Sequence, residues 1–446
     1  MTDYLIAKME PISVSKKHFL KLSIFCFIIF IGVFLRDVYG FPINKFIFLA
    51  IVIFAFFALN ESNLVAFISF LIPFLPGLPA NFIIAFAIPF IIHKQKNITV
   101  NMYVFSIYAY LLLELVHQLF SLSSLGEYSK FSVYIILLTL ILYRKDSNYD
   151  YPVILLSYGI GVIASFTAII VHSLKYVSIN SVFEQGIRIG NIAYVNDQFR
   201  ATTITLTMDQ NTLGYFCSIA IAIFLALLYA KKLHPIIAIF LIIVTFIYGS
   251  LTLSRTFFLI SIGIFLYYFI VNLRLNKNSI KVCFSLFVMI VIILFTIIVY
   301  FPHTIEMLID RFQESDITNG RGMIFQKYNQ FMFSNLDNFL FGIGLQNMHI
   351  KTNFFFVPHN GLQQIFVSGG VIGFLLIVFW LIGMYVNNRS KDKRNRFVYL
   401  LPLVTLFTYI QALQFLSPYF IMLPLLVVFL TLRLPDSITR QKEKEN

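Results

Sequence analysis

Long apolar runs alternate with short polar segments along almost the whole chain. A helix that crosses a lipid bilayer needs about twenty mostly apolar residues, and most of the runs come close to that length. Their apolar residues are continuous rather than alternating, which favours helices over the strands of a membrane barrel. The pattern predicts an all-α, polytopic transmembrane helix bundle of about 12–14 spans with a large, partly helical outer loop. The runs cover residues 18–36, 43–60, 63–76, 79–93, 101–120, 131–144, 151–173, 211–230, 235–252, 256–272, 280–301, 361–386, 397–416 and 418–433.

The third and fourth runs allow two interpretations. They are short and are separated only by Pro76-Gly77-Leu78-Pro79. The segment either crosses the membrane twice or forms a re-entrant hairpin that does not cross. In the second case, protein or water must surround the backbone groups that the turn leaves without partners. Both interpretations leave the orientation of every later span unchanged.

The basic residues give the predicted bundle an orientation. With the N-terminus inside, 21 of the 33 Lys and Arg residues fall in inside segments and 11 in outside segments. Cytoplasmic loops of membrane proteins carry such an excess, so we expect both termini in the cytoplasm. The two long polar segments, residues 174–210 and 302–360, then both lie outside as periplasmic loops of one membrane domain, residues 1–446.

Composition narrows the function classes. Hydrophobic residues make up 59% of the chain and charged residues 12%, whereas soluble proteins carry roughly 25% charge. The net charge of +13 is distributed in short clusters between apolar runs, which is typical of orientation signals rather than of nucleic-acid binding. The inside segments are short and contain no phosphate-binding loop motif, so nucleotide-driven chemistry on that side is disfavoured.

A polar island of about sixty residues, from Phe301 to Asn360, interrupts the apolar pattern. We expect it to form an active-site cap on the outer face. Arg321 follows Asn319-Gly320 and has no acidic residue within four positions, so its guanidinium is available to hold a diphosphate by two hydrogen bonds. The spacing of the apolar residues after Arg321 predicts an amphipathic helix that lies on the bilayer. Arg311 is a weaker candidate, because Asp310 and Glu314 favour local ion pairing.

Arg255 lies at the only polar break in the apolar stretch from Pro235 to Asn272. We expect a tight helical hairpin to turn there, on the outer side. An arginine at such a depth costs several kcal/mol unless it is paired or faces a cavity. Arg255 therefore either extends to the lipid headgroups as an anchor or binds a lipid-borne phosphate.

His359 ends the polar island within Pro358-His359-Asn360-Gly361. Its pKa near neutrality and the neighbouring proline make it the candidate general base. His303, which follows Pro302 at the other membrane boundary, is the closest rival, and Asn360 is a secondary candidate. In the first outer segment, Arg200 is a further phosphate or sugar contact, although Asp197 is an equally good partner for it.

No motif indicates a metal or a cofactor. The outer acidic residues are scattered, and neither a zinc-protease motif nor a serine-hydrolase motif occurs. The three cysteines all lie inside apolar runs, as expected of buried thiols. The residues therefore predict metal-free chemistry in which arginines hold a diphosphate leaving group and one histidine activates a hydroxyl.

An ordered set of motifs lies within about residues 196–375: Leu251-Thr252-Leu253-Ser254-Arg255, Gly320-Arg321, Phe341-Gly342-Ile343-Gly344-Leu345, His359-Asn360-Gly361-Leu362 and Gly369-Gly370-Val371-Ile372-Gly373. This set resembles the O-antigen ligase and O-antigen polymerase superfamily of bacterial polytopic membrane glycosyltransferases. The resemblance implies a metal-independent, inverting glycosyl transfer from an undecaprenyl-diphosphate-linked glycan. It also implies that His359 is the base and that Arg255, Arg321 and Arg200 contact the diphosphate. Relatives commonly carry a tryptophan after Arg321, where this chain has Ile324-Phe325.

Three functions follow as hypotheses. The first is a polymerase that joins lipid-linked repeat units of an O-antigen or capsule at the outer face of the bacterial cytoplasmic (inner) membrane. The second is a ligase that transfers the finished glycan to lipid A core. A flippase and a chain-length regulator are the implied partners of both enzymes, and no nucleic acid is implied. The third is a flippase-like transporter of lipid-linked sugars, which the lack of a convincing internal repeat disfavours.

Overall fold

The computed structural model describes residues 16–94, 101–120, 125–144, 149–184, 188–190, 205–206, 208–275, 320–348, 352, 357–390 and 396–435, together with single positions between 284 and 300. Over these residues the chain is helical and contains no strand. Five of the described helices are long and apolar enough to span a membrane, and eight shorter apolar helices accompany them. The prediction of an all-α polytopic bundle is confirmed.

The helix bounds follow the apolar runs closely. The run 397–416 divides into α18 and α19, and the run 418–433 divides into a π-helical turn, η6, and α20. Most of the run 280–301 lies outside the described residues. The elements are α1 (Lys16–Tyr39), α2 (Lys45–Ala58), α3 (Glu61–Leu71), η1 (Ile72–Gly77), α4 (Ala80–Lys94), α5 (Met102–Leu119), α6 (Leu125–Leu142), α7 (Tyr151–Ser173), α8 (Ile179–Glu184), α9 (Gln210–Tyr229), α10 (Pro235–Ser250), α11 (Arg255–Leu275), α14 (Arg321–Phe333), α15 (Leu336–Phe341), η5 (Leu345–Asn347), α17 (Gly361–Asn388), α18 (Arg396–Tyr399), α19 (Leu401–Ile410), η6 (Pro418–Met422) and α20 (Leu425–Thr431).

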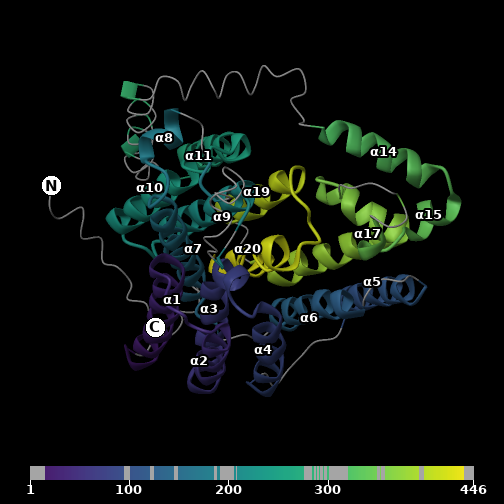
Figure 1. Ribbon diagram of the computed structural model, residues 1–446, viewed down its shortest axis with the longest axis horizontal. Helices are drawn as coiled ribbons and strands as arrows, with labels where there is room; N and C mark the ends of the chain where they lie inside the picture. Colours follow the sequence, from purple (N-terminus) through teal and green to yellow (C-terminus); the bar gives the residue numbers. More distant parts are fainter. Residues whose placement is uncertain are drawn as a thin grey trace.

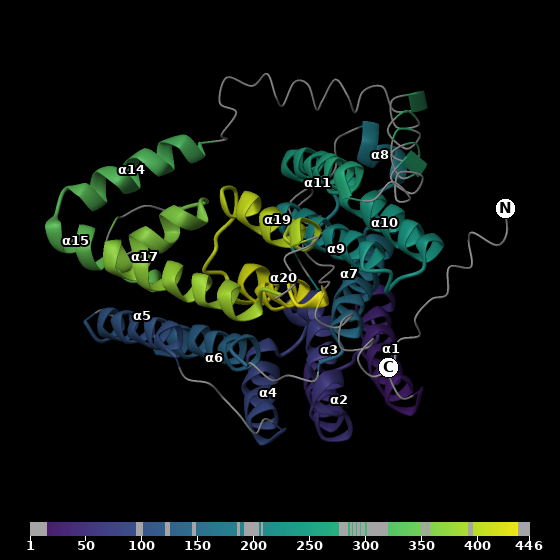
Figure 2. The same cartoon turned by 180° about the vertical axis from the view of Figure 1, so that it is seen from behind.

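The helices are arranged as a main bundle with an arm at one side (Figure 1). In the main bundle α9 is almost wholly buried and packs against α7, α10, α11 and α19. In the arm, α17 lies between α5 on one side and α14 with α15 on the other, as both views show (Figures 1 and 2). An apolar helix that is buried on all sides forms the centre of a large core, so α9 is the element around which the bundle is packed.

Two hydrogen bonds show how the ambiguous segment 61–94 runs. The Arg36 guanidinium, at the end of α1, donates to the carbonyl oxygen of Gly77 at 2.9 Å. The Lys94 ammonium instead donates to the carbonyl oxygen of Phe56, near the end of α2, at 2.8 Å. Because the ends of α1 and α2 lie at opposite ends of the bundle, α3 with η1 runs the length of the bundle and α4 returns. This favours two crossings over a re-entrant hairpin.

Polar contacts gather at each end of the bundle. At one end, which we call the Asp37 end, the Asp37 carboxylate accepts a hydrogen bond from the Thr205 hydroxyl at 2.8 Å, and the Asp37 carbonyl oxygen contacts His172 Nδ1 at 2.8 Å. At the other, the Glu61 end, Arg144 pairs with Glu61. At each end, these contacts join residues that the charge pattern places on the same side of the membrane, whereas the side that each end faces stays a prediction.

Candidate functional site

The chain turns sharply between α10 and α11, at the polar break where the sequence predicts a hairpin. Leu253 adopts a left-handed conformation with φ of 48°, and the side chains around the turn bond to the first turn of α9. The Oδ1 atom of Asn211 accepts hydrogen bonds from Ser254 Oγ at 3.0 Å and from Arg188 Nη2 at 3.3 Å. These bonds place Arg255, the first residue of α11, next to the start of the central helix.

The Pro358-His359-Asn360-Gly361 motif has a structural explanation. The Asn360 side chain caps α17, accepting hydrogen bonds from the backbone N–H groups of Leu362 at 3.0 Å and Gln363 at 3.1 Å. Its amide group also donates to Gln411 Oε1 at 3.1 Å. Gly361 has no room for a side chain, because a Cβ would lie 2.6 Å from Ile410 Cγ2. The motif thus packs the start of α17 against the end of α19. His359 is half-buried beside this contact.

Arg321 is the first residue of α14, and α14 is held against α17. The side-chain amide of Gln363 donates to the carbonyl oxygen of Phe325 at 2.7 Å and to Asn329 Oδ1 at 3.0 Å. On the same side of α14, Tyr328 and Met332 are fully buried. α14 is therefore a helix, as predicted, with one face packed on the protein. Its contact with a bilayer stays a prediction.

The glycine-rich motifs bring two backbones into direct contact. The N–H groups of Ile343 and Gly344 donate to the carbonyl oxygens of Val367 at 3.0 Å and Ser368 at 2.8 Å. A Cβ on Gly342 would lie 2.3 Å from the Ser368 carbonyl oxygen. Gly370 has a φ of 62°, which breaks the helical geometry of α17 at this point. Only glycine fits this approach and this conformation readily, so the two motifs together fix the polar island to α17.

A buried carboxylate on α5 stabilises the same contact between the two glycine-rich segments. Glu114 of α5 is 2% exposed; its Oε1 accepts a hydrogen bond from the Tyr110 hydroxyl and its Oε2 one from the Leu345 N–H, both at 2.9 Å. The Tyr110 hydroxyl also lies 2.9 Å from Ser368 Oγ. A buried acid is costly unless its oxygens are bonded, and here both are. Glu114 thus fastens the segment after Gly344 to the membrane helix α5.

Arg255, Arg321 and His359 come together at this end of the bundle, and Asp209 joins them. Burial lowers the pKa of His359 below its ordinary value of 6.5; the charge of Arg321 lowers it further, and the charge of Asp209 raises it. Burial also lowers the pKa of Arg321, which Asp209 raises and Arg255 lowers. An arginine with a lowered pKa is still charged, so two guanidinium groups and a neutral imidazole share one site near neutral pH.

All four residues lie at or just before the start of a helix. Asp209 caps α9, Arg255 and Arg321 are the first residues of α11 and α14, and His359 stands two residues before α17. Helix N-termini carry partial positive charge, and their N–H groups bind phosphate readily. The arrangement can therefore hold an anion such as a diphosphate. It can also offer a neutral imidazole as a proton acceptor beside that anion.

Three of the predicted site residues, Arg200, Arg311 and His303, lie outside the described residues. Asn360 has an observed role as a helix cap. The sequence analysis missed Asp209, which it counted as one of the scattered outer acids. An acidic residue directly before an apolar helix is a recognisable capping signal, but its closeness to Arg321 and His359 is a property of the fold. Within the described residues, no three His, Cys, Asp or Glu side chains are grouped as metal ligands.

Comparison with known proteins identifies one family. Residues 240–378 match the family model described as "O-Antigen ligase". The match contains α11, α14, α15 and most of α17, and hence Arg255, Arg321 and His359, whereas Asp209 precedes it. No curated protein and no solved structure matches the chain. The family match confirms the resemblance found in the sequence motifs.

Proposed function

The chain carries the O-antigen ligase region of the O-antigen ligase and polymerase superfamily, and from this premise we propose that it is a surface-polysaccharide polymerase. It joins undecaprenyl-diphosphate-linked oligosaccharide repeat units of an O-antigen or capsule. The reaction takes place at the outer face of the cytoplasmic membrane, which corresponds to the Asp37 end of the bundle. The donor is lipid-linked, and the acceptor is a second lipid-linked glycan.

One observation carries the proposal: two arginines and a histidine, at or just before the starts of three helices, lie near one another at one end of the helix bundle. A diphosphate bound to a sugar is a good leaving group, so the protein has to stabilise its charge and to activate the attacking hydroxyl. Arg255 and Arg321 supply the positive charge, and the N-termini of α11 and α14 add to it. His359 supplies the proton acceptor.

The proposed step is a single displacement. A hydroxyl oxygen of the acceptor sugar attacks the anomeric carbon of the donor, while the bond from that carbon to the diphosphate oxygen breaks. The hydroxyl proton passes to the imidazole of His359, and the lipid diphosphate leaves with its electron pair. Attack from the face opposite the leaving group inverts the anomeric configuration. Asp209 stabilises the imidazolium that forms, because its charge raises the pKa of His359.

The alternative is an O-antigen ligase, which uses the same donor but transfers the glycan to lipid A core. The family match is compatible with both enzymes. The Trp-poor, aromatic-rich composition, with 1 Trp and 52 Phe, favours the more variable polymerase branch. Since both enzymes need the same leaving-group and base chemistry, the acceptor distinguishes them.

A deletion strain separates the two enzymes. Loss of a polymerase is expected to leave single repeat units on lipid A core, visible as one short band above the core on a lipopolysaccharide gel. Loss of a ligase instead leaves the core bare, and lipid-linked polymer accumulates. An unchanged ladder of long chains in the deletion strain, together with an unchanged amount and length of capsule, would contradict both enzymes.

A further inference from the structure

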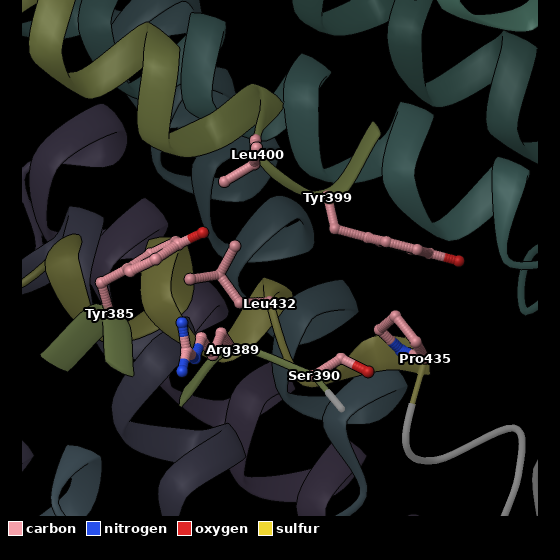
Figure 3. A pocket seen from close by; sticks show the side chains of 7 residues that line it. All are labelled: Tyr385, Arg389, Ser390, Tyr399, Leu400, Leu432 and Pro435. Carbon is pink, nitrogen blue, oxygen red and sulfur yellow. The ribbon is translucent and has the colours of Figure 1, made fainter. Parts of the chain in front are cut away.

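A small pocket lies at the Glu61 end of the bundle, away from the site described above. It is lined by residues at the end of α17, in α18, and at the ends of α19 and α20: Tyr385, Arg389, Ser390, Tyr399, Leu400, Leu432 and Pro435. Its empty volume is about 240 Å³ and includes space open to the surface. Figure 3 shows Tyr385, Leu432 and the Arg389 guanidinium on one side of the pocket and Ser390 and Pro435 on the other.

Hydrogen bonds hold the helix ends that form the pocket in place. The Arg433 guanidinium donates to the carbonyl oxygens of Arg144 at 2.7 Å and Asn387 at 3.1 Å, which ties the end of α20 to the ends of α6 and α17. The Asn388 side chain donates to the Leu142 carbonyl oxygen at 2.9 Å. The ring of Tyr399 packs edge-on against Tyr229, with 5.9 Å between the ring centroids. The pocket is therefore a fixed feature of four packed helices.

The arginines around this pocket differ in what they bind. Arg144 pairs with Glu61, and Arg433 donates to backbone oxygens. Arg389 is exposed, and its guanidinium makes no hydrogen bond or ion pair with any residue that the structure describes. Its backbone N–H, by contrast, closes α17 by donating to the Tyr385 carbonyl oxygen at 2.8 Å. Among the described residues, no anionic side chain is paired with the Arg389 cation at the mouth of this pocket.

The position of the pocket identifies the kind of anion. α17 is a candidate membrane span that ends at Asn388, and Arg389 follows it directly in the sequence. Tyrosines such as Tyr385 and Tyr399 are enriched at this level of a membrane. Along the sequence, residues 389–396 contain five basic residues and one acidic residue. Basic pockets between helices on the cytoplasmic side attract the headgroups of anionic lipids.

We propose that this pocket binds the phosphate headgroup of an anionic phospholipid from the leaflet at the Glu61 end. The Arg389 guanidinium pairs with the phosphate, and the Tyr385 hydroxyl donates a hydrogen bond to it. Leu400, Leu432 and Pro435 contact the apolar part of the lipid next to the headgroup. The space inside the pocket is small and open to the surface, so it suits a headgroup seated at its mouth rather than an enclosed nucleotide or oligosaccharide.

Binding is measured on the full-length protein, purified and delipidated in detergent. Phosphatidylglycerol, phosphatidylcholine or inorganic phosphate is titrated, and the rise in Tm gives an apparent affinity. We expect phosphatidylglycerol to raise Tm at lower concentrations than phosphatidylcholine does. Arg389→Gln should weaken the apparent affinity for phosphatidylglycerol roughly fivefold, which corresponds to one basic residue near an anionic lipid surface. Tyr385→Phe should weaken it less.

A matched control distinguishes a site from diffuse attraction. Lys231→Asn removes one positive charge from the exposed residue after α9 at the same end of the bundle, outside the pocket, and should leave the affinity unchanged. Arg389→Lys keeps the positive charge and should retain most of the binding. If Arg389→Gln does not fold, the affinity of the lysine variant is measured in its place. Equal affinity for the two lipids, an equal loss in Lys231→Asn and Arg389→Gln, or a response to inorganic phosphate alone would overturn the proposal.

Discussion

At the scale of single residues, the site is a balance of charges around one imidazole. Arg321 favours the neutral form of His359, and Asp209 favours the protonated form. The sequence allowed Arg255, Arg321 and His359 to be chosen, because an arginine at an apolar turn and a histidine at a span boundary stand out against their surroundings. Asp209 could not be chosen in this way, since its distance from the other three is fixed only by the packing of α9 against α11.

The charge of Asp209 predicts a pH effect. Burial and Arg321 place the pKa of His359 below 6.5, so the neutral base persists as the pH falls to that value, and the acid limb of the rate profile should lie below it. Asp209→Asn removes the charge that raises this pKa, so the midpoint of the acid limb should move to still lower pH. The measurement is the rate of glycan extension by the purified variant across pH.

The substitution is nearly isosteric and preserves the helix cap. Asp209 accepts hydrogen bonds from the N–H groups of Asn211 at 2.9 Å and Thr212 at 3.2 Å, and asparagine caps helices as well as aspartate does. Asp337→Asn, an exposed acid of α15, is the matched control and should leave the profile unchanged. A midpoint that stays in place or moves to higher pH in Asp209→Asn would contradict the assigned electrostatics.

At the scale of elements, the glycine motifs and α5 hold the polar island against α17. The sequence shows that glycines recur at 342, 344, 369 and 370. These glycines are needed because two backbone segments contact each other there. The sequence alone does not show that these two segments lie side by side. The role of Glu114 was missed for a related reason. One acid within an apolar helix shows that a partner is required, but it does not show which N–H group supplies it.

Removing the carboxylate of Glu114 should loosen this contact. Glu114→Ala leaves the partly buried N–H of Leu345 without its acceptor, which costs about 1–3 kcal/mol. That cost corresponds to about 5- to 150-fold faster hydrogen exchange at the Leu345 amide, measured by mass spectrometry on peptides from this segment.

Tyr110→Phe is the control for Glu114→Ala. It removes the other hydrogen bond to Glu114 but keeps the one from Leu345, so the Leu345 amide should remain protected. If exchange at Leu345 is unchanged in Glu114→Ala, or equally fast in both variants, Glu114 does not fasten the segment.

At the scale of the whole molecule, the fold was largely predictable because a membrane allows few architectures. The apolar runs located most of the described helices. The contacts between distant segments at each end of the bundle could not be predicted. The hydrogen bond from Arg433 to the Arg144 carbonyl oxygen, for example, links residues 289 positions apart. Such pairings follow from packing, which also favours two crossings for the segment 61–94.

The account depends most on His359 as the proton acceptor, and a turnover assay tests this directly. The purified protein in lipid vesicles is given lipid-linked repeat units, and the rate of glycan extension is compared for the wild type, His359→Ala and His93→Ala. The last variant removes an exposed imidazole at the Glu61 end of α4. A general base contributes about 10²–10⁴-fold to a rate. We therefore predict a loss of that size in His359→Ala, with normal membrane insertion, and an unchanged rate in His93→Ala. A wild-type rate in His359→Ala would contradict the proposed mechanism.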